Sequence, residues 1–417
     1  MSKLTYKIYT LGCKVNQYDS GCLEKVLGQQ GIKLAKMRAS LAIINTCAVT
    51  KTAISKDQKM INLAKKENPQ ARIIVLGCWP KAYQPSMTGV DLWWPERDWK
   101  KLVAEIIARW GDKKNNKPLE TCAFQLIPSD KSRYFIKIQD GCRQFCSYCI
   151  IPFTRGELES RPPKEILEEI RAAIKSGYQE IVLSGIHLGL YGADLKERIN
   201  LSEIIRRIIK LSGLGRVRLS SIEITEVSNE LIELMKSNRK FCQHLHISLQ
   251  SGSDKILKLM NRPYTKKYFA DRVKRLRQAC PNVSLTTDII VGFPGESEAD
   301  FLETYNFAKK IGFSKIHVFS FSAHEKTKAF SLPHKVRPEV IKLRSEKLRQ
   351  LSKELEERYR AEILKKYKNK LLPVVVEATR GEKWRGKTEF YFDVYFSKAQ
   401  MKTKLRNLIG KIIDIKL

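Results

Sequence analysis

Short apolar runs alternate with helically spaced apolar residues in the first part of the chain. The runs at 7–12, 41–45 and 72–76 predict strands, and the spacing at 20–30 and 53–66 predicts helices between them. Strands that are apolar along their whole length are typical of a parallel sheet covered on both faces. Residues 1–112 are therefore expected to form an open parallel α/β sheet domain, which ends at the polar, proline-containing linker 111–118.

The same alternation continues on a longer scale in the middle of the chain. Each predicted strand is followed by a helical pattern, and the succession is typical of a barrel whose active site lies at the carboxyl ends of its strands. We therefore expect a partial (β/α)6 barrel over residues 130–335. The predicted strands are 135–139, 180–183, 216–221, 244–249, 283–291 and 315–321, and the predicted helices are 164–175, 201–211, 229–236, 268–279 and 298–310.

A long charged helix opens at Pro338 and extends to about residue 368, with 336–358 as the segment that connects the barrel to the tail. Alternating runs at 372–377, 390–396 and 409–415 predict strands, with Gly381, Gly386 and Gly410 as breakers. We expect residues 359–417 to form a small β-barrel. The expected fold class is α/β, with an N-terminal open sheet domain, a central partial barrel and this small all-β tail.

The composition of the chain predicts a class of binding partner. The 417 residues include 77 Lys and Arg against 44 Asp and Glu, a formal net charge of +33. The excess is spread along the chain and favours binding to nucleic acid, although a basic surface can also simply keep a protein soluble. No apolar run approaches the ~18 residues of a membrane span, and the first residues lack the apolar core of a secretory signal. We expect a cytoplasmic protein without a membrane partner.

The clearest chemical motif is Cys142-x3-Cys146-x2-Cys149, placed just after the first predicted barrel strand. Three thiolates on one loop suit three irons of a cubane cluster, which leaves the fourth iron open to a substrate or cofactor. The alternative is a zinc site that lacks one ligand. Structural zinc normally takes four protein ligands, and no further Cys or His follows at short spacing.

A second set of cysteines is scattered in sequence: Cys13, Cys47 and Cys78 each follow a predicted strand of the first sheet. The carboxyl ends of parallel strands share one crevice, so these thiols are expected to converge there on a second cluster with an open iron. The alternative is three independently buried thiols. The remaining cysteines have no partners at ligand spacing and are expected to be structural or incidental: Cys22, Cys122, Cys242 and Cys280.

His244 and His246 alternate on the fourth predicted barrel strand and so point to one face. We expect packed or hydrogen-bonded histidines here, not metal ligands.

With Tyr148 before its last cysteine, the motif of Cys142, Cys146 and Cys149 resembles the C-x3-C-x-aromatic-C signature of the radical S-adenosylmethionine (SAM) superfamily. The resemblance implies a [4Fe–4S] cluster on these cysteines, SAM bound to its open iron, and reductive cleavage of SAM to a 5′-deoxyadenosyl radical. It also implies SAM contacts from the aromatic residue and from the ends of successive barrel strands, where glycines allow close backbone approach. These cofactor-binding residues are Tyr148, Ser184, Gly185, Glu223, Gln250, Ser251, Asp288 and Gly292.

A three-cysteine domain, a radical SAM barrel and a β-barrel tail together resemble the methylthiotransferases over essentially the whole chain. The segments 150–157, 160–162 and 260–265 match stretches of that family. The tail, through 384–388 and 391–394, resembles an RNA-binding TRAM domain, with Glu389-Phe-Tyr-Phe in place of its usual tyrosine-rich stretch. The resemblance implies two [4Fe–4S] clusters, the one on Cys13, Cys47 and Cys78 carrying the sulfur that accepts a methyl group from one SAM.

The segment 10–18, Thr-Leu-Gly-Cys-Lys-Val-Asn-Gln-Tyr, looks like the branch that modifies N6-threonylcarbamoyladenosine at position 37, beside the tRNA anticodon. The isopentenyladenosine branch usually has Gln-Met-Asn after this cysteine, and a third branch modifies a ribosomal-protein aspartate. The implied activity is transfer of a methylthio group to C2 of the base. The implied partners are the tRNA anticodon stem-loop, an electron donor such as flavodoxin or ferredoxin, and a sulfur donor, with the enzyme acting as a monomer.

Two other functions stay open at this point. One is a different radical SAM enzyme that uses the first triad only to relay electrons, and the other is a non-catalytic, metal-stabilised RNA-binding protein. Arg155 and Arg161, just after the cysteine loop, could contact SAM or RNA phosphate, or serve as salt-bridge partners.

Overall fold

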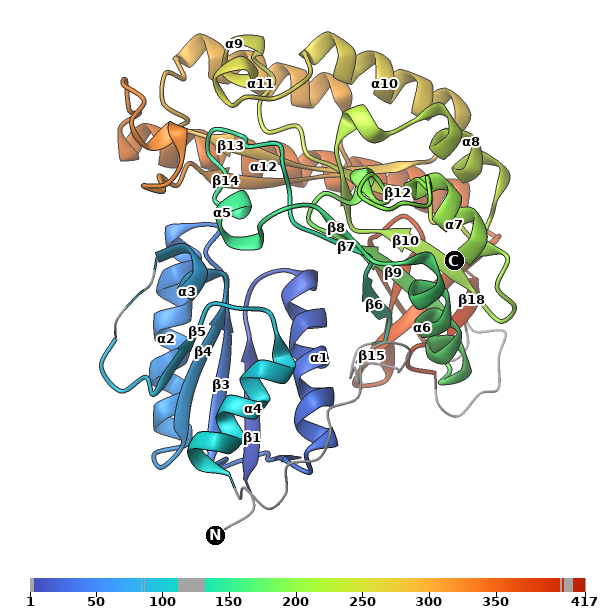
Figure 1. Cartoon of the computed structure of the whole chain (residues 1–417). Helices are drawn as coiled ribbons and strands as arrows, with labels where there is room; N and C mark the ends of the chain where they lie inside the picture. The colour runs from blue at the N-terminus through green and yellow to red at the C-terminus, as the bar shows by residue number, and fades with distance from the viewer. Residues whose placement is uncertain are drawn as a thin grey trace.

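The computed structural model describes residues 4–83, 85, 87–111, 132–397, 400 and 408–416. Figure 1 shows an N-terminal sheet with its helices, a larger central body, and a C-terminal sheet on the side where the barrel begins. Cys122 and most of the linker 111–118 lie outside the described residues. Within them, no helix has the length and apolar character needed to cross a bilayer.

The N-terminal sheet has five parallel strands in the order β2-β1-β3-β4-β5. Helices α1 and α4 pack on one face and α2 and α3 on the other, so the central strand β3 is buried along its whole length. This confirms the expected parallel sheet. The bounds are β1 Thr5–Thr10, α1 Lys14–Gln29, β2 Lys33–Leu34, β3 Leu41–Thr46, α2 Lys51–Glu67, β4 Arg72–Gly77, α3 Cys78–Tyr83, β5 Leu92–Trp94 and α4 Trp99–Trp110.

The central body has the expected arrangement of parallel strands with helices outside. Two parallel sheets, β10-β9-β6 and β11-β12-β13-β14, are joined because β10 and β11 are separated by Ser220 alone. The strands are β6 Tyr134–Lys137, β9 Glu180–Ser184, β10 Arg216–Leu219, β11 Ser221–Ile222, β12 His244–Ile247, β13 Ser284–Val291 and β14 Lys315–Ser320. The helices are α6 Pro163–Lys175, α7 Leu201–Ile209, α8 Asn229–Ser237, α10 Lys266–Ala279 and α11 Glu298–Ile311.

Short elements that the sequence pattern did not predict surround the open end of the core. The strands β7 Gln139–Asp140 and β8 Glu159–Ser160 pair antiparallel and flank the cysteine loop and helix α5. They are too short to show a period. The other short elements are α5 Ile151–Arg155, η2 Leu188–Leu190, η3 Ile224–Glu226, α9 Asp254–Leu259 and η4 Lys328–Phe330.

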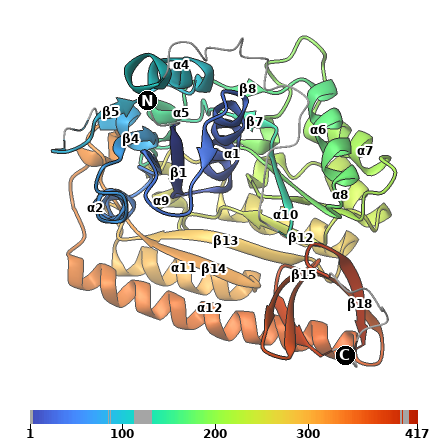
Figure 2. The same cartoon turned by 90° about the horizontal axis from the view of Figure 1, so that it is seen from below.

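The long helix α12, Pro338–Lys366, packs along β13 and β14 and leads into the C-terminal sheet (Figure 2). It is continuous through residues 358 and 359, so the boundary set there falls inside a helix. The tail is an antiparallel sheet in the order β17-β16-β15-β18. Its strands are β15 Leu371–Arg380, β16 Lys383–Thr388, β17 Asp393–Phe396 and β18 Ile412–Lys416.

The sequence pattern missed β16 because Gly386 was interpreted as a strand breaker. In the sheet Gly386 lies between two neighbours: an added Cβ would stand 2.9 Å from Val374 Cγ2 and 3.1 Å from Phe396 Cε1. The glycine therefore allows close packing in the middle of a strand, and does not end it.

Candidate active site

Three cysteines lie at the carboxyl edge of the N-terminal sheet. Cys13 caps the start of α1, Cys47 follows β3, and Cys78 begins α3. Gly12 and Gly77 have φ of +90° and +98°, and an added Cβ would stand 2.9 Å from Cys47 Cβ and 2.5 Å from Asn45 Oδ1, respectively. The turns before Cys13 and Cys78 thus pack directly against the turn that carries Cys47, and only glycine fits at that approach.

Two buried asparagines hold these turns. The Asn16 side-chain amide donates to the carbonyl oxygens of Leu11 at 2.9 Å and Thr46 at 2.8 Å, and Asn45 donates to the Asn16 carbonyl at 3.0 Å. Each side chain satisfies backbone groups that turn geometry leaves unpaired. Sequence reasoning assigned no role to either residue, although a polar residue at the end of a buried strand, as at Asn45, is a usable signal.

Burial favours the neutral form of the Cys13 and Cys47 thiols. It raises the pKa of Cys13 and raises the pKa of Cys47 to about 12, and a charge on Cys78 would oppose ionisation of both. The positive charge of Arg155 works in the opposite direction and lowers the pKa of Cys13. Bound iron would supply the counter-charge that lets such thiols ionise, so the donor set fits a thiolate-bound cluster. All three are free cysteines.

The second triad lies on the loop between β7 and α5. Gly141, with φ of +71°, precedes Cys142, and an added Cβ there would collide with the Glu157 carbonyl. Ser147, inside the loop, donates from its backbone N–H to the Met260 carbonyl at 3.0 Å and from its hydroxyl to the Leu259 carbonyl at 2.7 Å. Backbone contacts thus fix this loop on both sides.

Arg262 and His187 contact the second triad and were not assigned from the sequence. The Arg262 guanidinium donates to Cys146 Sγ at 3.2 Å, and His187 Nδ1 lies 3.3 Å from Cys142 Sγ. Burial raises the pKa of Cys146, and Arg262 opposes that rise. A cation beside a thiolate stabilises its charge, so Arg262 favours the cluster-binding form. The sequence pointed to Arg262 only by its place in the segment 260–265, which resembles a stretch of the methylthiotransferases.

Two of the residues expected to bind SAM make contacts within the protein instead. Glu223 forms an ion pair with Arg262, while the Ser251 hydroxyl lies 3.1 Å from Thr304 Oγ1 and is 3% exposed. Within the described residues, no three Cys, His, Asp or Glu side chains are placed so that they could bind a single metal ion. Each thiolate of a cubane binds a different iron, so such a triad is spread more widely than the ligands of a single ion.

A small cavity of about 140 Å³ borders the loop of the second triad at Tyr148, and Gln250 and Asp288 also lie on its wall. Gln250 has φ of +64°, and its Oε1 is buried without a hydrogen-bond partner in the described part of the chain. A buried acceptor left unpaired is costly unless a ligand donates to it. These three expected SAM residues therefore meet at one place that fits a donor-bearing ligand.

A larger cavity of about 610 Å³ connects the parts of the molecule. Its wall includes Cys13, then Ser184, Gly185 and Asp288 from the core, and Tyr391 from the turn after β16. Its volume is within the range of ~300–1,000 Å³ usual for ligand sites.

The two histidines of β12 also border this cavity. His244 and His246 both hydrogen-bond to Thr286 Oγ1, at 3.1 and 2.9 Å. This confirms their expected hydrogen-bonded role.

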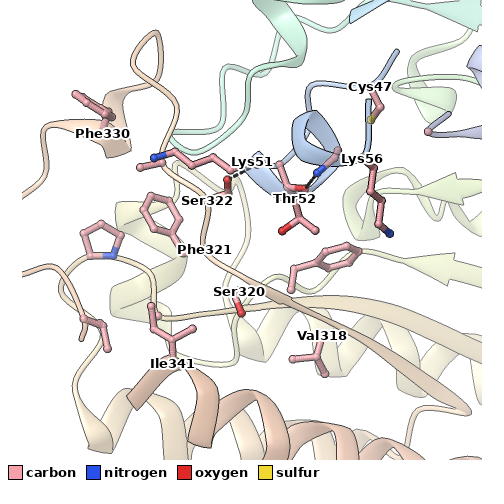
Figure 3. Close-up of a pocket in the computed structure, with 18 of the residues that line it drawn as sticks. Cys47, Lys51, Thr52, Lys56, Val318, Ser320, Phe321, Ser322, Phe330 and Ile341 are labelled. Carbon is pink, nitrogen blue, oxygen red and sulfur yellow. Dashed lines mark hydrogen bonds between the residues drawn. The ribbon is translucent and has the colours of Figure 1, made fainter. Parts of the chain in front are cut away.

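A third cavity, of about 840 Å³, shares Gly12 with the second and lies between α2 and the end of β14. Figure 3 shows Lys51, Thr52 and Lys56 on one side of it and Ser320 to Ser322 on the other. The Lys51 backbone N–H donates to Ser322 Oγ at 2.9 Å across this boundary. Gly292, expected at SAM, lines this third cavity instead of the other two.

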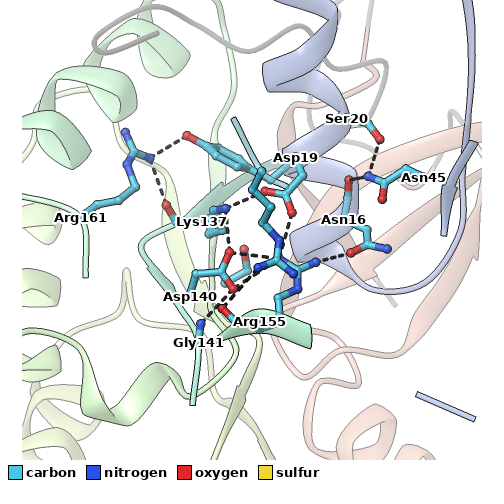
Figure 4. A network of polar contacts seen from close by, with 12 residues as sticks. Asn16, Asp19, Ser20, Asn45, Lys137, Asp140, Gly141, Arg155 and Arg161 are labelled. Carbon is cyan, nitrogen blue, oxygen red and sulfur yellow. Dashed lines mark hydrogen bonds and ion pairs between the residues drawn. The ribbon is translucent and has the colours of Figure 1, made fainter. Parts of the chain in front are cut away.

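A buried polar network joins the N-terminal sheet to the core (Figure 4). Arg155 donates to Asp19 at 2.9 Å and Asp140 at 3.0 Å, and Lys137 contacts the same two carboxylates at 2.6 and 2.9 Å. Arg161 pairs with Glu169 at 2.8 Å. Of the two roles weighed for Arg155 and Arg161, the structure therefore places both in salt bridges.

Two family models match the chain. The radical SAM superfamily model covers residues 136–308, and the model of the uncharacterized protein family UPF0004 covers residues 5–91. The solved radical SAM methyltransferase TsrM from Kitasatospora setae aligns with a TM-score of 0.56 at 13% identity, covering 79% of this chain and 77% of its own. That likeness shows the fold of the core.

Curated relatives match nearly the whole chain. The threonylcarbamoyladenosine tRNA methylthiotransferase MtaB of Bacillus subtilis is 35% identical over 99% of this chain and 93% of the relative. The tRNA-2-methylthio-N(6)-dimethylallyladenosine synthase of Lachnoclostridium phytofermentans is 32% identical over 99% of this chain and 93% of the relative. Identity of this extent, together with the two family models, shows that the chain belongs to the radical SAM methylthiotransferase family.

Proposed function

We propose that this enzyme transfers a methylthio group to C2 of N6-threonylcarbamoyladenosine at position 37 of tRNA. The observation that carries the proposal is the cavity of about 610 Å³ with Cys13 on one wall and Ser184, Gly185 and Asp288 on another. A base placed in it would lie against Cys13 of the first triad and close to Ile151, which follows the loop of the second triad. A base stacked in an anticodon loop has to be extruded to enter such a site.

Two [4Fe–4S] clusters and SAM fit the donors present. We infer that Cys13, Cys47 and Cys78 hold one cluster and that Cys142, Cys146 and Cys149 hold the other, with SAM beside Tyr148 and Gln250. When bound, these groups supply the radical that activates an unreactive C–H bond and the sulfur that replaces its hydrogen. An electron donor such as flavodoxin or ferredoxin and a sulfur donor complete the reaction.

The side chains of the protein itself bind and orient the cofactors and the base. Arg262 and His187 hydrogen-bond to the thiols of the second triad, and the unpaired Gln250 Oε1 is available to a donor of SAM. Asp288 borders both the small cavity and the larger one, so it lies between the cofactor side and the base side. Lys51 and Lys56 at the adjacent cavity add positive charge where the RNA backbone would enter.

The choice of nucleoside rests on similarity. Four relatives named as threonylcarbamoyladenosine enzymes are 35–37% identical, and four named as dimethylallyladenosine enzymes are 32–34% identical. The segment 10–18 also resembles the first group. The second candidate substrate is accordingly N6-isopentenyladenosine, also called dimethylallyladenosine.

Mass spectrometry of tRNA nucleosides tests the proposal directly. A strain that lacks the gene should lose 2-methylthio-N6-threonylcarbamoyladenosine and regain it when this gene is restored. Loss of the methylthio-isopentenyl nucleoside alone would contradict the proposal and support the second candidate. No change in any methylthio nucleoside would contradict both.

Cysteine variants separate the two triads. After anaerobic reconstitution, Cys146→Ala should abolish SAM cleavage, whereas Cys47→Ala should keep cleavage and lose methylthiolation. Cys280→Ala is the matched control, because this buried thiol belongs to neither triad. A Cys47→Ala enzyme that still methylthiolates tRNA would show that the first triad does not carry the sulfur.

A further inference from the structure

One end of the 610 Å³ cavity is formed by Lys14 and Tyr391, which come from opposite ends of the chain. Lys14 follows Cys13 directly, and Tyr391 belongs to the turn between β16 and β17. The Lys14 ammonium lies 5.7 Å from the centre of the Tyr391 ring and 6.0 Å from that of Phe135. A cation and a phenol therefore lie next to the position where the first triad would present its sulfur.

The positive charge of Lys14 is not matched by an acid. Three other cations lie within 6 Å of the Tyr391 ring, and each has a carboxylate: Arg133 pairs with Glu377, Arg218 with Glu180, and Lys387 with Asp393. In the part of the chain that the structure describes, Lys14 forms no salt bridge or hydrogen bond. A cation at a cavity wall without a counter-ion is a ready site for an anion.

Tyr391 is held in place firmly. It is a non-glycine residue with φ of +71°, and its ring stacks on His244 with a centroid distance of 4.5 Å. Arg218 donates to the carbonyls of Thr388 and Glu389 at 2.9 and 2.8 Å, which anchors the turn on the core. Strained backbone that the surroundings enforce is often found where a ligand binds.

An orphaned polar atom lies at the same end. His244 is 2% exposed, borders the cavity, and has a buried Nδ1 without a hydrogen-bond partner among the described residues. The Tyr391 hydroxyl also makes no hydrogen bond within that part of the chain. A ligand with several oxygen atoms and a hydroxyl or N–H group would satisfy these groups, whereas a purely apolar one would leave them unpaired.

We propose that Lys14, with Tyr391 and His244, forms a subsite for a carboxylate-bearing substituent on N6 of the target base. The inference rests on the proposed function and deepens it. C2 of adenine and C6, the carbon that bears N6, flank the same ring nitrogen, so a base whose C2 faces the first triad carries its N6 substituent only a few bonds away. Cys13 and Lys14 are likewise neighbours in the chain. The amino-acid carboxylate of the substituent then becomes the counter-ion of Lys14.

Three synthetic anticodon stem-loops test this subsite. They carry threonylcarbamoyladenosine, its neutral threoninamide analogue, or isopentenyladenosine at position 37, and kcat/KM for methylthiolation is measured for each. The natural enzyme should prefer the carboxylate over the amide by about 10- to 100-fold, the usual value of a charge-assisted contact. Lys14→Gln should erase that preference by slowing the carboxylate substrate alone. Tyr391→Phe should reduce it partly, and Lys14→Arg should keep most of it.

The ratio of two RNAs within one variant does not depend on how much enzyme carries its clusters, so incomplete reconstitution leaves the test valid. Lys33→Gln, on the exposed edge strand β2, is the matched control and should keep both the full preference for the carboxylate and SAM cleavage without RNA. If Lys14→Gln keeps the full preference for the carboxylate, the subsite is wrong while the proposed function stands. If the natural enzyme acts on the isopentenyl RNA and not on the threonylcarbamoyl RNA, the proposed function and the subsite both fail.

Discussion

Glycines before three of the cysteines bring chain segments closer than any side chain would permit. Gly12 and Gly77 bring the turns of the first triad together, and Gly141 allows the loop of the second triad to pass the Glu157 carbonyl. All three have positive φ. At this scale the sites depend on positions without side chains as much as on the thiols themselves.

Gly141→Ala should remove the second cluster selectively. The added methyl group meets backbone, which cannot move aside as a flexible side chain can, so the loop cannot close around iron. We expect reconstituted enzyme to bind half the iron of the natural protein and to lose SAM cleavage. Iron analysis and a SAM cleavage assay measure this.

Gly381→Ala is the control for backbone strain. It has φ of +59° but no heavy atom within 4 Å of an added Cβ, so it should cost only about 1 kcal/mol and keep all its iron. A Gly141→Ala enzyme with a full iron content would show that the loop has an alternative path.

Helix α11 starts with a capping box that also ties it to the end of the fourth core strand. Asp300 accepts hydrogen bonds from the Ser297 backbone at 2.9 Å, from Ser253 Oγ at 2.9 Å and from Lys255 at 2.7 Å. Burial alone would raise the pKa of Asp300, but these donors hold it well below its usual value. The ionised carboxylate therefore contributes stability to this element.

Asp300→Asn should lower the free energy of unfolding by about 2 kcal/mol at neutral pH. Because the folded-state pKa is depressed, this contribution is complete above the unfolded pKa of about 4 and is lost as the pH falls below it. The difference between the two proteins in urea unfolding should therefore shrink below about pH 4. Asp271→Asn, at an exposed position of α10, should change little at any pH. A difference that stays constant on acidification would contradict this assignment.

The whole molecule brings three sequence regions to one cavity, and the buried network around Arg155 helps to set their positions. Asp19 of α1 is 3% exposed and binds both Arg155 and Lys137 of the core. Buried ion pairs contribute little net stability, but removing one partner leaves an uncompensated charge. The network thus acts mainly to fix how the first triad faces the second.

Asp19→Asn should uncouple the two triads. It leaves Arg155 and Lys137 short of one carboxylate, so we expect methylthiolation of tRNA to fall by at least about tenfold while SAM cleavage without RNA persists. Both rates can be measured on one preparation. Glu67→Gln, which weakens only the partly exposed contacts of Glu67 with Lys7 and Tyr9, is the matched control and should have little effect. Equal loss of both activities in Asp19→Asn would indicate a general folding defect instead.

The sequence alone determined the order and type of the main elements. Apolar periodicity located β1, β3 and β4, the core strands with β10 and β11 as one run, and their helices, because burial against neighbours imposes a local repeat of apolar positions. It missed β2, β5 and β16: the first two have only two and three residues, and the third contains Gly386. The cysteine spacing also grouped the thiols into two triads, since ligands on one loop or at successive strand ends are recognisable without coordinates.

Only the tertiary structure decided what surrounds those thiols. Arg262 reaches Cys146 across 116 positions, and Tyr391 reaches a cavity that Cys13 and Lys14 also line. In the folded protein, Ser251 also hydrogen-bonds to Thr304, and Arg155 belongs to a salt-bridge network. Such contacts depend on how whole sheets and loops pack, and no local pattern of polar and apolar positions records which distant side chains will face each other.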